Sequence, residues 1–137
     1  MIRYFIETSV IVGYLRGQAP AISLLEGLDG ELTSSYICLA ELYEGIYRVK
    51  ERASAEVGVK AFFSGLNTVF GINKEIAREF GKIRAHLKRK GQTIEDIDIL
   101  IAATCLANEL TLVTLNLKHF SGIRGLKLRT EGEKFST

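Results

Sequence analysis

Strand-like and helical segments alternate along the chain. Short segments typical of buried strands fall at residues 2–6, 31–34, 68–72, 111–115 and 126–128. Between them, apolar side chains recur at the spacing of amphipathic helices, at residues 10–15, 21–28, 36–52, 54–66, 74–90 and 96–109. Because strands that alternate with helices form right-handed crossovers, we expect a three-layer α/β/α fold around a mostly parallel, four- to five-stranded sheet.

The helix expected at residues 74–90 has the clearest pattern. Gly91 is expected to end this helix. Its apolar residues share one face: Ile76, Phe80, Ile83 and Leu87. The helix expected at residues 96–109 is apolar almost all round, so we expect it to be buried.

Size and composition describe an ordinary globular domain. The 137 residues are 47% hydrophobic and 25% charged, which predicts one domain over residues 1–137 with a polar tail from about residue 130. The formal net charge of +2 does not by itself indicate a nucleic-acid-binding protein. Cys38 and Cys105 lie in apolar helical patterns, so we expect buried free thiols. We find no leader pattern and no apolar run long enough to span a membrane, and we expect a cytoplasmic protein.

Polar side chains follow two of the expected strands. Glu7 comes directly after the first strand, and Asn116 comes after the strand at residues 111–115. Ligands of open parallel sheets bind beyond the carboxyl ends of the strands, so this edge is the expected site. Thr8 and Ser9 add hydroxyl groups beside Glu7, and one of them is expected to cap the first helix.

Two further acids are expected near the same edge. Asp98 lies near the amino end of a buried helix, and Glu41 lies among apolar residues that carry it inward. Each acid alone has an ordinary explanation: a turn residue for Glu7, a helix cap for Asp98, an ion pair for Glu41. Converging carboxylates would repel one another unless a cation joined them, and oxygen ligands favour Mg²⁺ or Mn²⁺ over zinc. Neither His86, on a polar helix face, nor the isolated His119 supports a zinc site.

Four segments, taken in order, resemble the motifs of PIN-domain nucleases and most closely those of VapC toxins from prokaryotic toxin–antitoxin pairs. These segments are residues 5–11, the helical Glu41, residues 98–103 and residues 112–120. The resemblance covers nearly the whole chain. It implies a Mg²⁺- or Mn²⁺-dependent endoribonuclease that cuts transfer RNA or another structured RNA. It also implies a homodimer that a VapB-type antitoxin holds inactive.

The same resemblance implies the roles of individual residues. The implied catalytic residues are Glu7, Glu41, Asp98 and Asn116. The implied metal ligands are Glu7, Asp98, Glu41 and, because some members carry an acid nearby, Asp96. Thr114 matches the hydroxyl residue of the family and would support the site together with Thr8 and Ser9.

Two positions depart from the family pattern. Glu7 stands where the family usually carries aspartate, and its extra methylene is expected to weaken cation binding or to misplace the attacking water. The sequence is compatible with a natural or an introduced glutamate. Asn116 stands where an aspartate is common, so a weaker second metal site is expected. The alternative function is therefore a catalytically weakened domain that binds RNA or an antitoxin.

Basic and apolar surfaces suggest where partners bind. The basic residues expected to bind RNA lie on the helix at residues 74–90, where a solvated helix face is the ordinary alternative: Arg78, Lys82, Arg84, Lys88 and Arg89, with Lys90 beside them. The helix at residues 36–52 has more apolar residues than one core contact needs. Together with Val10, Ile11, Tyr14 and Leu15 it is expected to form a groove for an antitoxin helix, or a dimer interface, with ordinary core packing as the alternative for each single residue.

Two other small α/β classes are disfavoured. A phosphoacceptor receiver domain needs an aspartyl nucleophile at a strand end, which neither Glu7 nor Asn116 supplies. A dinucleotide-binding domain needs a glycine-rich loop after the first strand, and this chain has none there.

Overall fold

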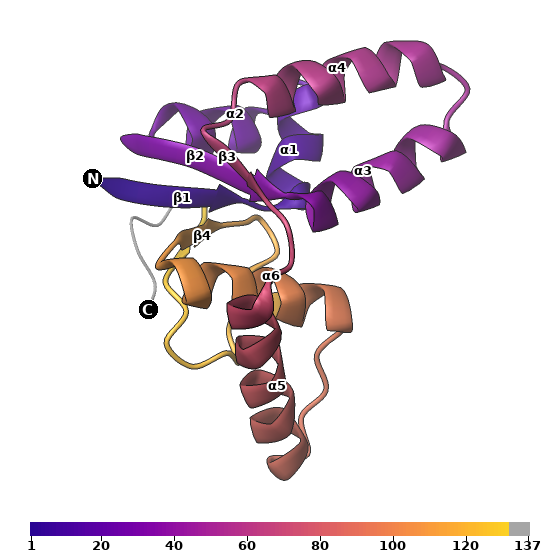
Figure 1. Cartoon of the computed structure of the whole chain (residues 1–137). Helices are drawn as coiled ribbons and strands as arrows, with labels where there is room; N and C mark the ends of the chain where they lie inside the picture. Colours follow the sequence, from indigo (N-terminus) through magenta and orange to yellow (C-terminus); the bar gives the residue numbers. More distant parts are fainter. Residues whose placement is uncertain (132–137) are drawn as a thin grey trace.

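Five parallel strands form the centre of the molecule (Figure 1). The computed structural model describes residues 1–131, so most of the expected polar tail lies outside the described residues. The strands are β1 (Ile2–Ile6), β2 (Gly30–Ser35), β3 (Thr68–Phe70), β4 (Thr111–Val113) and β5 (Leu128–Arg129). They lie in the order β3-β2-β1-β4-β5, and each neighbouring pair is parallel. The expected parallel sheet is confirmed.

Helices cover both faces of this sheet. They are α1 (Thr8–Leu15), α2 (Ala19–Glu26), α3 (Tyr36–Arg48), α4 (Arg52–Ser64), α5 (Lys74–Arg89), α6 (Asp96–Asn108) and α7 (Leu117–Phe120). Side chains of α1 to α4 form one buried cluster, and side chains of α6 and α7 form the other, with α5 packed against it. In Figure 1, α1, α2 and α4 lie above the sheet, and α5 and α6 lie below it. The three-layer α/β/α fold is therefore confirmed.

The central strand β1 is packed on both faces. Tyr4 and Ile6 join the cluster formed with α1 to α4, whereas Phe5 joins the cluster beneath α6. None of the three is more than 1% exposed. Successive residues of a strand point to opposite faces, so a strand covered on both sides needs an unbroken apolar run.

The predicted boundaries agree with the structure within two residues, except at the end of α3. The helix expected at residues 36–52 ends earlier, at Arg48, because the backbone is extended at Val49 (φ −105°, ψ 161°) and turns back into α4. This reversal lets Val59 of α4 pack in the same cluster as Ile46. Strand β4 ends at Val113, and the short helix α7 after it was not predicted. The first helix begins at Thr8, for a reason given by the site below.

The cysteine prediction is confirmed. Cys38 and Cys105 are buried and free. Burial raises the pKa of the Cys38 thiol to about 12, so it packs as a neutral group behind the strand ends. Among the helices of residues 1–131, none combines the length and apolar character that crossing a membrane requires.

Candidate active site

Glu7 lies at the carboxyl end of β1. Its backbone N–H donates to the carbonyl oxygen of Val113 at 3.0 Å, so the residue continues the pairing of β1 with β4. Its side chain is buried. The carboxylate oxygen Oε1 accepts hydrogen bonds from Ser9 Oγ and, at 2.6 Å, from Thr114 Oγ1. One donor comes from α1 and the other follows β4, so two elements fix the position of this carboxylate.

Backbone groups orient both hydroxyl donors. The N–H of Leu115 donates to Ser9 Oγ at 3.0 Å, and the N–H of Asn116 donates to Thr114 Oγ1 at 2.9 Å. A hydroxyl group has a single proton, and here each proton is directed at Glu7. Ser9 and Thr114 therefore hold the Glu7 side chain at the strand end.

Glu41 lies on α3 and faces α1. The hydroxyl of Thr8 donates to Glu41 Oε1 at 2.6 Å. Helix α3 is itself held at this edge by Ser35, the last residue of β2, whose hydroxyl accepts from two backbone N–H groups of the first helical turn. The expectation that Thr8 or Ser9 caps α1 is wrong, because both hydroxyls donate to carboxylates and Glu7 occupies the cap position.

Asp98 lies in the first turn of α6 and is paired with a histidine. His119 Nδ1, on α7, lies 3.2 Å from Asp98 Oδ2. The Asp98 side chain is 15% exposed, whereas the imidazole is 55% exposed. The expectation that His119 stands alone is therefore wrong. In the sequence, only the position of His119 three residues after Asn116 indicated that it lies near the site. Its contact with Asp98 was missed because the short helix that turns it toward α6 was not predicted.

The carboxylates of Glu7, Glu41 and Asp98 lie close enough for their charges to interact. Burial raises the pKa of Glu41, and the charges of Glu7 and Asp98 raise it further. Burial also raises the pKa of Asp98, with a contribution from Glu7 and an opposing one from His119. The structure thus brings together acids from three elements that are far apart in sequence.

The donor chemistry at this edge suits a hard divalent cation. Carboxylate oxygens are preferred by Mg²⁺ and Mn²⁺, and a bound cation would offset the repulsion that raises the pKa of Glu41 and Asp98. Both hydroxyls donate to Oε1 of Glu7, so neither occupies Oε2. Within residues 1–131, however, no three His, Cys, Asp or Glu side chains approach closely enough to hold an ion between them. The acids fit a cation by chemistry, but simultaneous direct ligation by all three is not preformed.

Two other candidates do not join this cluster. Asn116 is exposed at the cap position of α7, and its side chain makes no capping hydrogen bond. Asp96 is exposed at the start of α6 and forms an ion pair with Arg84. Neither contributes to the raised pKa of Glu41 or Asp98. Their roles as a fourth catalytic residue and an extra ligand stay predictions.

The basic residues expected to bind RNA differ in their surroundings. Arg84 is engaged with Asp96 and with a backbone carbonyl, and Lys82 lies 3.2 Å from Glu79. The others are exposed and have no ion-pair partner among the described residues: Arg78, Lys88 and Arg89. Helix α5 extends away from the sheet, so these three side chains lie on a projecting element (Figure 1).

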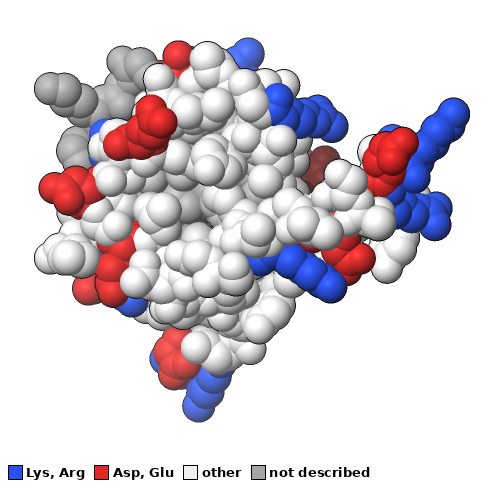
Figure 2. All heavy atoms as spheres, turned by 90° about the horizontal axis from the view of Figure 1, so that it is seen from above, with Lys and Arg blue, Asp and Glu red and all other residues white. Residues whose placement is uncertain are grey.

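An apolar groove of about 520 Å³ lies between α1, α2 and α4. Tyr14 and Leu15 line it, together with Phe62 of α4. Figure 2 views the molecule from the side of α2 and α4, where charged side chains lie at the margin and the centre is uncharged. The expectation that Val10 and Ile11 line such a groove is wrong, because both are fully buried in the core. No residue of α3 lines this groove, and a partner surface on α3 stays a prediction.

Comparison with known proteins identifies the family. The family model described as PIN domain matches residues 4–125, a range that contains all three clustered carboxylates. The chain belongs to the PIN-domain family. The resemblance inferred from the four motifs is thereby confirmed.

This PIN domain is similar to curated VapC proteins over most of its length. It is 32% identical over 118 residues to "Ribonuclease VapC19" of Mycobacterium tuberculosis, covering 84% of this chain and 90% of that protein. It is 31% identical over 132 residues to "Ribonuclease VapC2" of Haemophilus influenzae, covering 96% and 98%. Among solved structures, VapBC2 from Rickettsia felis, bound to a DNA fragment from its promoter, matches with a TM-score of 0.85 at 29% identity, covering 93% of this chain and 98% of that chain.

Proposed function

We propose that this PIN domain is a Mg²⁺- or Mn²⁺-dependent endoribonuclease and the toxin of a toxin–antitoxin pair. The names of its relatives, VapC ribonucleases and VapBC complexes, support this proposal. The observation that carries it is the convergence of Glu7, Glu41 and Asp98 at the carboxyl edge of the sheet, where their charges interact. Mutual repulsion of this kind costs stability and is expected where a cation binds.

The residues at this edge are proposed to have different roles in cation binding. Glu7 and Asp98 would be the principal cation ligands, directly or through water, with Glu41 as a third. A bound divalent cation supplies an activated water and offsets charge on the phosphate oxygens. Ser9 and Thr114 hold the Glu7 carboxylate through their protons.

The test is RNA cleavage with and without Mn²⁺ or Mg²⁺. Single-stranded RNA and transfer RNA are incubated with the wild-type protein and with Asp98→Ala. We expect metal-dependent internal cleavage that falls by at least about 100-fold in Asp98→Ala, while the circular dichroism spectrum is unchanged. Cleavage that needs no metal, or that survives this substitution, would reject the proposal.

The alternative, a weakened domain that binds RNA or an antitoxin, has one observation in its favour. Glu7 is longer than the aspartate usual in the family, and two hydroxyls already hold one of its oxygens. A Glu7→Asp variant separates the two functions. If only the aspartate variant cleaves RNA, the alternative is correct; if the wild-type protein cleaves as well, the enzyme assignment holds.

We also infer a VapB-type antitoxin partner and a homodimer, with the apolar groove as the antitoxin contact. Leu15 is 39% exposed in this groove, so Leu15→Glu is expected to weaken antitoxin capture at least tenfold. Val57 on α4 is 68% exposed and does not line the groove, so Val57→Glu is the matched control. Isothermal calorimetry with a co-expressed VapB-type antitoxin measures both affinities, and light scattering measures the dimer. Equal losses in the two variants would exclude the groove.

A further inference from the structure

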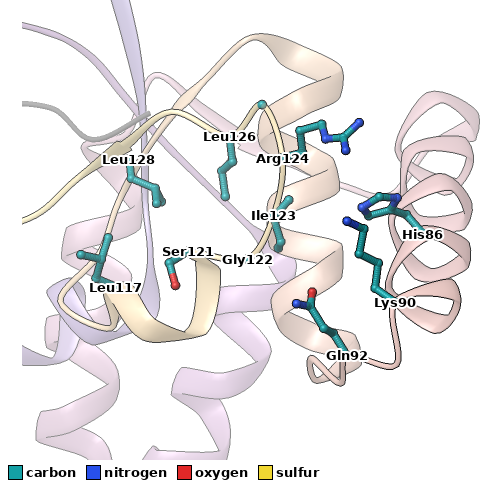
Figure 3. A pocket seen from close by; sticks show the side chains of 11 residues that line it. His86, Lys90, Gln92, Leu117, Ser121, Gly122, Ile123, Arg124, Leu126 and Leu128 are labelled. Atoms are coloured by element: carbon teal, nitrogen blue, oxygen red, sulfur yellow. The ribbon is translucent and has the colours of Figure 1, made fainter.

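A second cavity, of about 440 Å³, lies between the end of α5 and the segment that joins α7 to β5 (Figure 3). None of the three clustered carboxylates lines it. Leu117 of α7 forms part of its wall, while His119, two residues further on, contacts Asp98. Helix α7 therefore lies between this cavity and the candidate active site.

Three basic side chains line this cavity. His86 and Lys90 extend from α5, four residues and one helical turn apart, and Arg124 extends from the facing segment (Figure 3). No Asp or Glu lines the cavity. Within residues 1–131, none of the three takes part in an ion pair, although five other basic side chains lie beside carboxylates. The positive charges of Lys90 and Arg124 are therefore available to an anion.

The lowered pKa of His86 is consistent with this uncompensated positive charge. It is lowered first by burial and then by the charges of Arg124, Lys90 and Arg89. Glu79 and Lys82 line an adjoining cavity together with His86 and Arg124, and they pair with each other at 3.2 Å. An anion bound in the cavity would therefore reduce the repulsion among these basic side chains. A cation at the candidate active site would reduce the repulsion among the carboxylates in the same way.

The opposite wall of the cavity is apolar. This wall is formed by Leu117, Leu126 and Leu128. In Figure 3, Ile123 lies between these leucines and the side chains of α5. Gln92 and Ser121 add neutral hydrogen-bonding groups at the edge. The volume lies in the usual range of small-ligand pockets, roughly 300–1,000 Å³. An isolated phosphate would use only the basic side, whereas a nucleotide would use the basic side for its phosphate and the apolar side for its sugar or base.

We infer that this cavity binds one nucleotide of the RNA strand beyond the cleavage site, with the phosphate held by His86, Lys90 and Arg124. The inference rests on the proposed ribonuclease function. Because α7 separates the two sites, a strand that reaches both must cross α7. The cavity thus adds His86 and Arg124 to the basic residues of α5 that the sequence suggested as RNA contacts.

The two histidines of the chain provide a direct test, because each reports one site. The imidazole signals of His86 and His119 are followed by NMR in EDTA, where the proposed cleavage is stopped, while a single-stranded RNA of about ten nucleotides is added. We expect the His86 signals to shift and its apparent pKa to rise when the phosphate binds. The shift should be lost in Lys90→Gln/Arg124→Gln. Movement of the His119 signals alone would overturn the inference.

Affinity measurements supply the second test. In fluorescence anisotropy, Lys90→Gln/Arg124→Gln is expected to bind the same RNA about tenfold more weakly, with a salt slope reduced by about 0.7 because one phosphate is no longer neutralised. The control Arg16→Gln/Lys60→Gln removes the same charge from α1–α2 and α4, outside the cavity. Equal losses in the two variants would show a general charge effect and overturn the inference.

Small ligands separate a nucleotide site from a simple anion site. Inorganic phosphate and adenosine monophosphate are added in parallel to the wild-type protein. Stronger binding of the nucleotide supports the inference, and equal binding overturns it. Failure of the wild-type protein to cleave RNA would refute the proposed function, whereas an active Lys90→Gln/Arg124→Gln variant with unchanged RNA affinity would refute the cavity alone.

Discussion

Two hydroxyl groups determine where the Glu7 carboxylate lies. Thr114 accepts the backbone N–H of Asn116 and donates its own proton to Glu7, and Ser9 makes the corresponding pair of contacts from α1. The family resemblance named both hydroxyls as supporting residues, but the sequence does not show that both donate to the same oxygen of Glu7. The structure shows that the strand ends and the first turn of α1 are built around this carboxylate.

Replacing Thr114 by valine removes one donor without changing the side-chain shape. Thr114→Val is expected to lower kcat for metal-dependent RNA cleavage roughly 10- to 100-fold, because Glu7 is no longer held in place, and to change KM little. Thr114→Ser keeps the hydroxyl and should retain most of the activity. Steady-state kinetics on a short RNA measure both constants. A valine variant as active as the wild type would show that this hydrogen bond does not position the catalytic carboxylate.

Glu41 affects the stability of the metal-free protein. Its pKa is raised in the fold, so the folded chain binds this proton more tightly than the unfolded chain does. The stability contributed by the protonated group is fully present below the ordinary pKa of 4.5 and is lost as the pH rises through the raised value. Ionised Glu41 therefore destabilises the protein at neutral pH.

Glu41→Gln is accordingly expected to raise Tm at pH 7, by about 3 °C, while cleavage is lost. The glutamine oxygen keeps the hydrogen bond from Thr8, so the change is mainly one of charge. The difference in Tm should disappear below about pH 4, where Glu41 is protonated. Glu44→Gln, on the same helix but exposed, is the control and should leave Tm nearly unchanged. Thermal unfolding without metal, from pH 4 to pH 7, measures this difference. A Tm for Glu41→Gln below that of the wild type at pH 7 would contradict the prediction.

At the scale of elements, the periodic segments were predictable and the short ones were not. Helices α5 and α6 extend over several turns, so their apolar patterns fixed their positions within a residue. Helix α7 has only four residues, too few to show a helical period. The break at Val49 was missed because apolar and charged residues continue through it. Only the return of α4 onto the core explains the turn there.

Contacts between helices also decide which glycines can be replaced. A Cβ at Gly13 of α1 would lie 2.7 Å from the Cβ of Ala21 in α2, too close for either helix to accommodate without moving. Gly13→Ala is therefore expected to destabilise the protein by about 1–3 kcal/mol. A Cβ at Gly81 of α5 would meet no neighbouring atom within 4 Å, so Gly81→Ala should stabilise by about 0.5–1 kcal/mol through helix propensity. Urea unfolding measures both, and a stabilising Gly13→Ala would show that α1 and α2 pack less closely.

At the scale of the whole molecule, the parallel sheet explains why a site forms at one edge. The carboxyl ends of the strands meet there, so the rule that ligands bind beyond them pointed to Glu7 from the sequence alone. The contacts of Asp98 with His119 and of Asp96 with Arg84 could not be predicted. They depend on how α5 and α7 pack against α6, and nothing in the local sequence specifies that packing.

The proposed cation should stabilise the whole fold, because it binds the folded chain and not the unfolded one. At a Mn²⁺ concentration about 100 times its Kd, the expected gain is about 2.7 kcal/mol, which corresponds to a rise in Tm of about 10 °C. Asp98→Asn should lose most of this rise. The control Asp29→Asn, an exposed loop residue, should keep it.

The same measurement at several pH values tests the acid cluster as a unit. Protons compete with the cation for carboxylates whose pKa is raised, so the Mn²⁺-induced rise in Tm should shrink as the pH falls from 7 toward 4. This readout does not depend on RNA or on activity, so it holds even if Glu7 makes the enzyme slow. An equal rise in Tm for wild type and Asp98→Asn, or a rise independent of pH, would place the cation elsewhere on the molecule.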